Sequence, residues 1–362
     1  MATITQFDYV PVLKWRQGEY QALLKLRTAQ KDRIVPLLEI TPPEFDFETG
    51  KPAKSLDDHL RKFGPRLETK WGTRLALVDA GLIDPAARLI GGRHPLTGLF
   101  ADARARGGRI VPVTALDRDN AYQQAVKGIH AVDEQGACLR CSLDDAADED
   151  FDANVADLCD LLDVDIEDMD LVLDLRAAHF TPLDGLVTLI HTTMLGATSF
   201  AAARSLTIVS SAFPGSMANV TGPMQNWPRS EWSLYKKLID EAPEGSRLPA
   251  FGDYAISGPD LVTGDMRILK PSASIRYAID EAWIIVKGPN VRDNGYGQYK
   301  GHCNSVVKAT GYLGAAFSAG SDYVKKCGAG TANTGNLTTW RWVGTNHHLA
   351  KVVHDLSTFH GS

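Results

Sequence analysis

No hydrophobic run in the sequence is long enough to cross a membrane. Its longest apolar tracts, such as Trp283–Val286, span a few residues, whereas a transmembrane helix needs about 20. The opening residues Met1–Gln6 contain neither a basic segment nor an apolar one, so we expect no secretory signal. The five cysteines are an odd number and fall mostly inside predicted elements, which is typical of free thiols in a reducing compartment. Together these features predict a cytoplasmic protein without a membrane partner.

Common catalytic motifs are also missing. The chain has no HExxH zinc motif, no GxxxxGK[ST] phosphate loop, and no GxGxxG or GxSxG in a strand–turn–helix setting. Cys138 and Cys141 have CxxC spacing, but no second pair accompanies them, which argues against a zinc or redox site. The net charge of −6 argues against a protein that binds duplex DNA over its whole surface. A local nucleotide or nucleic-acid groove stays open as an interpretation, because residues 287–326 are mildly basic.

What the sequence does contain is a regular alternation of short apolar runs and helix-like stretches. Each run is rich in Val, Ile and Leu and ends on a polar or charged residue. Continuous apolar strands alternating with amphipathic helices are typical of a parallel sheet buried on both faces. Such a series fits a closed (β/α)8 TIM-like barrel, an α/β fold whose active sites lie at the carboxyl ends of the strands. The predicted strands are Tyr9–Lys14, Ile34–Glu39, Leu75–Asp79, Ile110–Thr114, Ala137–Arg140, Leu171–Asp174, Leu206–Ser210 and Leu248–Asp253.

The alternation stops after residue 256, which predicts a barrel over residues 1–256 and a C-terminal α/β region over residues 257–362. In this region Ser274–Ile279 and Ala282–Lys287 are predicted to form a strand pair, and a final helix is expected near His348–Leu356. Gly- and Asn-rich stretches separate these elements, and the region lacks a clear core of its own. We therefore expect it to pack over the barrel mouth as a cap rather than to form an independent domain.

Charged residues at the predicted strand ends form the main candidate site. Burying so many charges is costly unless they pair with one another or hold a ligand. The carboxylates are hard oxygen donors suited to Mg²⁺ or Mn²⁺, and the cations would hold an anionic substrate such as a phosphate. The predicted metal ligands are Glu39, Asp79 and Asp174, the predicted substrate-binding cations are Arg140 and Arg176, and Lys14 and Asp253 are predicted catalytic residues.

The same charges could instead satisfy one another as a ring of salt bridges that closes the top of the barrel. The pairs would be Lys14 with Glu39, Arg140 with Asp79, and Arg176 with Asp174. Lys14 could also form a Schiff base if it were desolvated. The sequence alone leaves these interpretations open.

Polar residues after the last two predicted strands are further candidates for substrate binding. Ser210 and Ser211 follow the seventh strand, where barrels often bind phosphate, and Tyr254 follows the eighth. Serine-rich loops are also common without any ligand. The loop Arg292–Lys300 interleaves aromatic and basic residues with glycines, which suits stacking on nucleic-acid bases and equally suits an exposed loop.

A cluster near the end of the chain combines a base, a cation and aromatic rings. Asn346 and His347 are expected to start the final helix, directly after the segment that contains Arg341 between two tryptophans. His347 could protonate a ligand and Arg341 could bind it. The alternative is ordinary helix capping by Asn346 beside buried tryptophans.

Two motifs of the chain resemble those of a known family. The opening Tyr9–Leu23 with Pro36–Ile40, and the closing Trp340–His348, are similar to the opening and closing motifs of the phage and bacterial "beta protein" family. These motifs bracket nearly the whole chain. Members occur in phage genomes and mobile bacterial regions, so the resemblance implies a phage–host setting, and a protein partner in a defence system, more than a particular reaction. Lys14, Glu19, Glu39 and His347 are the positions that match the family's motif.

From these features we expect a metal-dependent hydrolase of a phosphate-containing substrate, a nucleotide or nucleic acid, acting in antiviral defence. Mg²⁺ or Mn²⁺ would be its cofactor, Lys14 and Arg140 would neutralise developing charge, and Asp253 or His347 would be the general acid or base. One alternative is a non-catalytic subunit, antitoxin-like or sensor-like, that binds a ligand or a protein. A second is a lyase or isomerase acting on a small anionic substrate, with Lys14 as its base. The sequence does not decide whether the protein is an enzyme.

Overall fold

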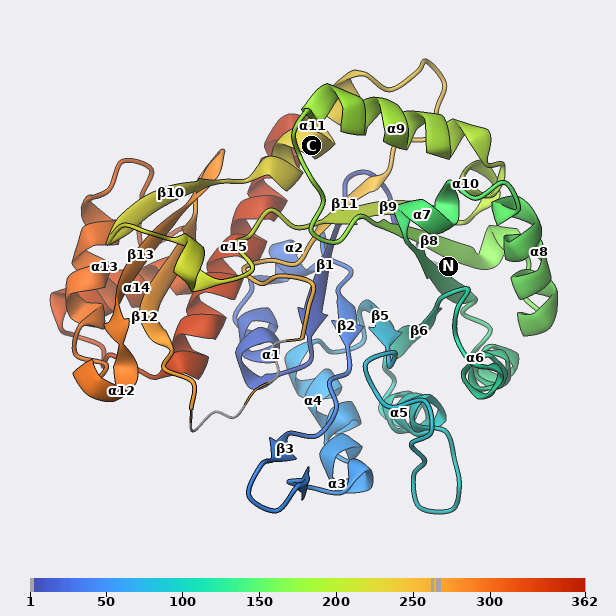
Figure 1. Cartoon of the computed structure of the whole chain (residues 1–362), viewed down its shortest axis with the longest axis horizontal. Coiled ribbons are helices and arrows are strands. Elements are labelled where there is room, and N and C mark those ends of the chain that lie inside the picture. The colour runs from blue at the N-terminus through green and yellow to red at the C-terminus, as the bar shows by residue number, and fades with distance from the viewer. Residues whose placement is uncertain (1–2, 262–263, 265–267, 362) are drawn as a thin grey trace. The chain divides into compact units, whose positions relative to one another are not determined.

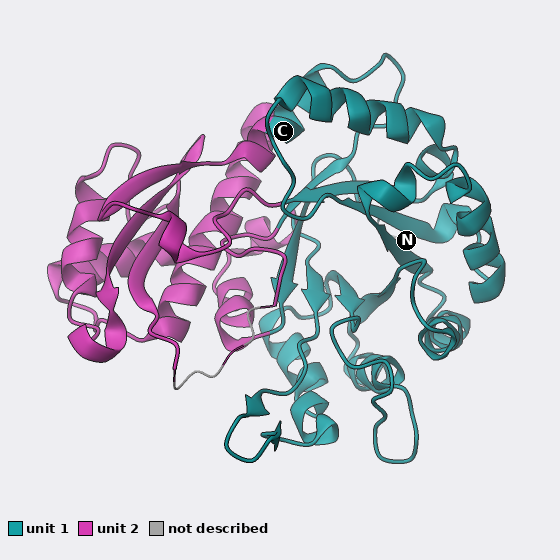
Figure 2. Cartoon of the chain, viewed as in Figure 1, with its two compact units in different colours: residues 1–15, 34–210, 234–253 teal, residues 16–33, 211–233, 254–362 magenta. Residues whose placement is uncertain are grey.

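The chain folds into two compact units, each assembled from segments that are distant in the sequence (Figure 2). The structure is a computed structural model that describes residues 3–261, 264 and 268–361. Unit 1 comprises residues 1–15, 34–210 and 234–253, and unit 2 comprises residues 16–33, 211–233 and 254–362. The second unit thus contains the predicted C-terminal region together with two segments that the sequence pattern placed in the barrel.

Unit 1 is a closed barrel of eight parallel strands, which confirms the predicted TIM-like fold (Figure 1). The order around the barrel is β1-β11-β9-β8-β7-β6-β5-β2. The strands are β1 (Tyr9–Lys14), β2 (Leu37–Glu39), β5 (Leu75–Asp79), β6 (Arg109–Thr114), β7 (Ala137–Cys141), β8 (Met169–Asp174), β9 (Ser205–Ser210) and β11 (Ala250–Asp253).

Apolar residues on both faces explain why these segments form barrel strands. All six residues of β8 and all six of β9 are buried, as expected for a parallel sheet covered by helices outside and side chains inside. Gly252 of β11 lies so close to its neighbours that a Cβ atom there would come within 2.5 Å of Val209 Cγ2 and 2.8 Å of the Val10 carbonyl oxygen. Close strand packing therefore requires glycine at this position.

Amphipathic helices connect the strands of unit 1. The side chain of Ser55 caps its helix by accepting from the backbone N–H of Asp58, and Asp119 caps another by accepting from the backbone N–H groups of Ala121 and Tyr122. A short hairpin of β3 (Phe45–Asp46) and β4 (Lys51–Pro52) follows β2. The helices are α3 (Leu56–Leu60), α4 (Phe63–Lys70), α5 (Pro95–Arg104), α6 (Asn120–Asp133), α7 (Leu143–Ala146), α8 (Phe151–Leu162), α9 (Leu183–Gly196), α10 (Ser199–Ala202) and most of α11 (Ser230–Asp240).

Unit 2 contains an antiparallel sheet in the order β10-β13-β12. The predicted strand pair is confirmed as β12 (Ser272–Ala278) and β13 (Ala282–Asn290), and β10 (Met224–Pro228) adds a third strand that was not predicted. The helices are α1 (Gln17–Leu24), α2 (Thr28–Lys31), α12 (Val291–Asn294), α13 (Tyr299–Lys308), α14 (Ala319–Ala329) and α15 (Leu337–Phe359).

Two expectations for this part of the chain were wrong. Unit 2 has its own hydrophobic core, formed by buried side chains of the sheet and helices that include Ile275, Tyr277, Val306 and Val324. Its final helix starts at Leu337, where Asn336 caps it, and not at Asn346. The predicted packing of this region over the barrel mouth stays a prediction. Among the described residues, no helix is long and apolar enough to span a membrane.

Candidate active site at the barrel mouth

The strand ends of unit 1 bring the predicted charged residues together. Lys14 pairs in register with Glu39, and Glu39 pairs in register with Asp79, so three neighbouring strands end on charged side chains. Glu39, Asp79 and Asp174 are only 4%, 3% and 5% exposed. Ionised groups this deeply buried need partners close by, and the guanidinium of Arg140 supplies them.

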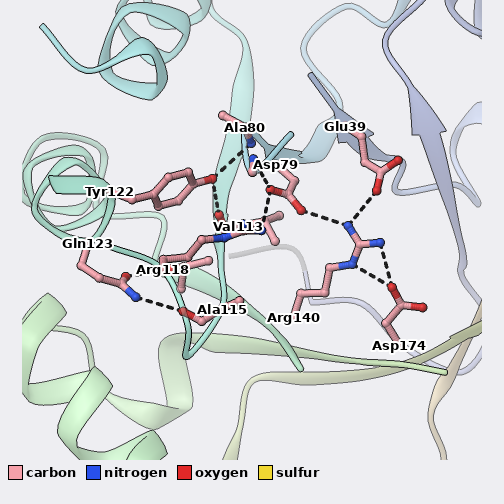
Figure 3. Close-up of polar contacts among 12 residues, drawn as sticks. Glu39, Asp79, Ala80, Val113, Ala115, Arg118, Tyr122, Gln123, Arg140 and Asp174 are labelled. Atoms are coloured by element: carbon pink, nitrogen blue, oxygen red, sulfur yellow. Dashed lines mark hydrogen bonds and ion pairs between the residues drawn. The ribbon is translucent and has the colours of Figure 1, made fainter. Parts of the chain in front are cut away.

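Arg140 lies between the three carboxylates and binds all of them (Figure 3). Its Nη1 donates to Glu39 Oε1 and to Asp79 Oδ2, each at 2.9 Å. Its Nε and Nη2 donate to Asp174 Oδ2 at 2.9 and 2.7 Å. The planar guanidinium has several donors in a fixed geometry, so it holds the three carboxylates in one arrangement.

This arrangement bears on the predicted metal site. The three predicted ligands do converge, but around Arg140, which uses one oxygen of each. Within the described ranges no group of three or more His, Cys, Asp or Glu side chains is placed to hold a metal ion. A metal bound by these carboxylates would have to displace the guanidinium. The Mg²⁺ or Mn²⁺ cofactor therefore stays a prediction.

The predicted pairs Lys14–Glu39 and Arg140–Asp79 are confirmed. Lys14 Nζ lies 3.4 Å from Glu39 Oε2, and Arg140 pairs with Asp79. Asp174 forms an ion pair with Arg140 through Oδ2. Its other carboxylate oxygen, Oδ1, accepts a hydrogen bond from the backbone N–H of Arg176 at 2.9 Å. Arg176 itself is exposed and has a φ of 50°, which few non-glycine residues adopt.

The Glu39 carboxylate has one oxygen with no hydrogen bond. Oε1 accepts from Arg140, but Oε2 is buried and accepts no hydrogen bond from any described residue, although the Lys14 amine is near. A buried acceptor without a donor costs about 1–3 kcal/mol. Oε2 is therefore able to accept a further hydrogen bond, although solvent does not reach it in this structure.

A residue that the sequence analysis did not select, Arg118, extends the network. Its Nη2 lies 3.3 Å from Asp79 Oδ1, its guanidinium carbon lies 5.3 Å from the centre of the Tyr122 ring, and its Nε is buried with no hydrogen-bond partner among the described residues. It follows the end of β6 in a strand-to-helix loop, which is where barrel sites are built. That position was the only signal in the sequence.

Arg118 lines a cavity of about 230 Å³ beside Asp79. Three carboxylates also line it, but Asp84 accepts from the backbone N–H of Ala86, and Asp119 caps α6. His94 contributes its ring, and burial lowers its pKa from the ordinary value of 6.5, followed by the nearby charge of Arg88. The cavity thus offers a neutral imidazole, a guanidinium with a free donor and the exposed carboxylate of Asp117. Its lining residues are Ala80, Gly81, Ile83, Asp84, Pro85, His94, Pro95, Asp117, Arg118, Asp119 and Tyr122.

The other predicted residues of unit 1, Asp253 and Ser210, are buried on neighbouring strands. Asp253 is 1% exposed, and its Oδ1 accepts from the hydroxyl of Tyr9, another residue that the sequence did not single out. Ser210 pairs in register with Asp253 and is also buried. Tyr9 stands opposite Phe251 in the β1–β11 register, so Asp253 lies next to Pro11, below the level of Lys14.

The remaining predicted residues belong to unit 2. His347 is 1% exposed and stacks on Tyr277, with its Nε2 at 2.7 Å from the Ala278 carbonyl oxygen and its Nδ1 at 3.2 and 3.1 Å from the hydroxyls of Ser318 and Ser321. Burial lowers its pKa to about 3. Both ring nitrogens therefore have partners within the unit, and the imidazole is neutral at pH 7.

Unit 2 also contains the predicted substrate-binding residues Arg341, Tyr254 and Ser211. Arg341 Nη1 donates to Ser257 Oγ at 2.6 Å, and its Nε lies 3.6 Å from Glu19 Oε1. Ser211 Oγ donates to the Ser257 carbonyl at 3.2 Å, and Tyr254 is buried. Asn346, the predicted helix cap, instead lies inside α15 and accepts from the backbone N–H of Gly320.

The chain has matches among protein families and among solved structures. The sequence model of the family described as Beta protein matches residues 9–354. No curated protein sequence matches the chain. Among solved structures, a mutant tryptophan synthase alpha-subunit from Pyrococcus furiosus has 9% identity and a TM-score of 0.40, covering 70% of this chain and 89% of its own. Triosephosphate isomerase from Bartonella henselae has 10% identity and a TM-score of 0.35, covering 68% and 92%.

Proposed function

The chain belongs to the Beta protein family, and we propose that its barrel mouth is the active site of a lyase or isomerase that moves a proton on a small hydroxy acid or amino acid. The observation that carries this proposal is the buried Glu39 Oε2, which accepts no hydrogen bond from the described residues and lies 3.4 Å from the Lys14 amine. A carboxylate and an ammonium side by side can remove a proton and supply one within the same site.

The two groups would divide the work as base and acid. Glu39 Oε2 takes the proton that leaves the substrate, and the Lys14 ammonium donates a proton to, or hydrogen-bonds, the oxygen on which negative charge develops. Both side chains come from adjacent strand ends, Lys14 from β1 and Glu39 from β2. Rigid strands hold such a pair more accurately than loops do.

Arg140 acts as a positioning residue. Because its Nη1 binds Glu39 Oε1, the other oxygen is left facing Lys14. Its remaining donors fix Asp79 and Asp174, which compensate its charge and keep the guanidinium from rotating. This role explains why so many charges are buried at the mouth, since buried ion pairs alone contribute little net stability.

The substrate class follows from the two unsatisfied groups. Arg118 Nε is a donor without a partner among the described residues, and Glu39 Oε2 is an acceptor without a donor. A molecule that carries a carboxylate for Arg118 and a hydroxyl or amine for Glu39 satisfies both. The cavity of about 230 Å³ that Arg118 lines has room for the carboxylate end of such an acid, and Glu39 and Lys14 are not among its lining residues.

Thermal-shift measurements with lactate, malate, glycerate and serine, and with Mg²⁺ and Mn²⁺ separately, test the proposal. We expect at least one of the acids to raise the melting temperature of the wild type and of Glu39→Gln, which keeps the side-chain shape, but not that of Arg118→Gln. Lys127→Gln, a change on the outer helix α6, is the matched control and should leave the shift unchanged.

Two results would contradict the proposal. One is that none of the four acids shifts the melting temperature. The other is a shift with Mn²⁺ or Mg²⁺ alone that disappears in Asp79→Asn, which would favour the metal-dependent hydrolase predicted from the sequence.

A further inference from the structure

A second cavity in unit 1 lies away from the barrel mouth. It has a volume of about 260 Å³ and is bounded by β9, by α9, α10 and α11, and by the segment before β11; Figure 1 shows these elements on one side of the barrel. Leu206 and Ile208 of β9 line it together with residues of the helices that cover this strand, and none of the charged residues at the mouth does. The cavity is therefore on the outer face of the barrel wall, between strand and helices.

The walls of this cavity are mainly apolar, and the polar side chains that line it are those of His191, Ser246 and Arg247. Protein interiors are close-packed and contain few voids larger than a water molecule. An engineered cavity of roughly 150 Å³ lined by Leu, Ile and Phe stays dry and binds benzene. The present cavity is larger, so it has room for an aliphatic chain. Its apolar lining consists of Met194, Leu195, Phe200, Ala201, Leu206, Ile208, Leu238, Ala242, Pro243 and Pro249.

The cavity opens to the surface at two of its lining residues, Leu195 and Ala201. Leu195 of α9 lines the cavity and is nevertheless 62% exposed, and Ala201 of α10 is exposed as well. An apolar side chain shared between a cavity and the surface indicates a route by which an apolar molecule can enter without unfolding of the wall.

Arg247 supplies a positive charge at the edge of the cavity. Its Nη1 donates to the carbonyl oxygens of Phe200 and Ala201 at 3.5 and 3.3 Å and to that of Ala203, and its Nη2 donates to that of Arg204. Carbonyl oxygens accept these hydrogen bonds but do not neutralise the charge. Burial lowers the pKa of Arg247 and the charge of Asp170 opposes this effect, but within residues 3–261, 264 and 268–361 no carboxylate forms an ion pair with Arg247. An anionic group bound here would gain a charge-assisted contact.

We propose that this cavity binds an aliphatic molecule with a single anionic head, of the size of a medium-chain carboxylate. The chain lies against Phe200, Leu206 and Ile208, and the head contacts Arg247 at the edge. This site is independent of the reaction proposed for the barrel mouth.

Isothermal titration calorimetry with decanoate, decanol and decylammonium, each below its micelle-forming concentration, tests this site on the full chain. We expect decanoate to bind at least ten-fold more tightly than the uncharged alcohol or the cation. Ala201→Phe, which places a ring at the opening, should weaken decanoate binding at least ten-fold. Ala202→Phe, at the next exposed position of α10, is the matched control and should leave it unchanged.

Arg247→Gln should reduce decanoate binding to the level of decanol, and if this variant does not fold, the comparison of the three ligands in the wild type decides the role of the charge. The proposal is overturned if decanoate does not bind, if all three compounds bind equally, or if Ala201→Phe binds decanoate as the wild type does. A dimer that Ala201→Phe dissociates, in a protein that binds no decanoate, would instead assign the cavity to contact between two copies of the chain.

Discussion

Replacing Arg140 by methionine should destabilise unit 1 strongly, because three buried carboxylates lose their common partner. Methionine keeps much of the side-chain volume and removes the hydrogen bonds to Glu39, Asp79 and Asp174. Removing one partner of a buried ion pair costs about 3–5 kcal/mol. The three pairs share one guanidinium, so their contributions are not additive. We expect a loss of about 3–5 kcal/mol in the free energy of unfolding, which is a large part of the usual 5–15 kcal/mol or so.

Urea denaturation followed by circular dichroism measures this loss. Arg106→Met is the matched control, since Arg106 pairs with Glu68 at 3.2 Å on the exposed outer surface and should cost no more than about 1 kcal/mol. Neutralising the carboxylates in the Arg140→Met background, with Asp79→Asn and Asp174→Asn, should restore most of the stability. A loss in Arg140→Met as small as that in Arg106→Met would refute the argument that this residue compensates buried charge.

Three further predictions concern the rest of the chain. Burial lowers the pKa of His347 to about 3, so the unfolded chain takes up a proton below the ordinary pKa of about 6.5 while the folded chain does not. The contribution of His347 to stability is therefore present above that pH and is lost as the pH falls. In urea titrations we expect the stability difference between wild type and His347→Gln to decrease by about 1.4 kcal/mol per pH unit below pH 6. Gly252→Ala should lower the free energy of unfolding by about 1–3 kcal/mol through overpacking. Gly128→Ala in α6, where a Cβ meets nothing within 4 Å, should raise it by about 0.5–1 kcal/mol. Equal melting temperatures of the Gly252→Ala variant and the wild type would contradict the overpacking. Tyr9→Phe removes the hydroxyl that donates to buried Asp253 and should lower the unfolding free energy by about 1–3 kcal/mol, so an unchanged urea midpoint would contradict this hydrogen bond.

The barrel could be predicted because its strands are apolar on both faces and alternate regularly with helices along the sequence. The predicted Tyr9–Lys14 and Leu75–Asp79 coincide with β1 and β5, and the other strands differ by a few residues at their ends. The carboxyl ends of parallel strands meet at one edge, so the convergence of Lys14, Glu39 and Asp79 followed directly from the strand assignment.

The features that could not be predicted depend on contacts between residues that are far apart in the sequence. The central position of Arg140 among three carboxylates depends on how far its side chain reaches across the barrel, which strand spacing does not reveal. The core of unit 2 combines the strands β12 and β13 with the helices α12 to α15, so it depends on contacts between elements that are separate in the sequence and not on the periodicity of any one of them. His347 sits in a polar motif, but its burial results from Tyr277 and Ala278 on a strand far away in the sequence.

Deuterium exchange tests the proposed proton transfer at the Lys14–Glu39 pair most directly. The wild type and Glu39→Gln are incubated in D₂O with lactate, malate, glycerate and serine, and the C–H protons beside each carboxylate are followed by proton NMR. We predict that the wild type exchanges the C–H proton of at least one of these acids for deuterium and that Glu39→Gln, although folded, does not. Absence of exchange with every acid, or equal exchange by both proteins, would contradict the assignment of Glu39 as the base.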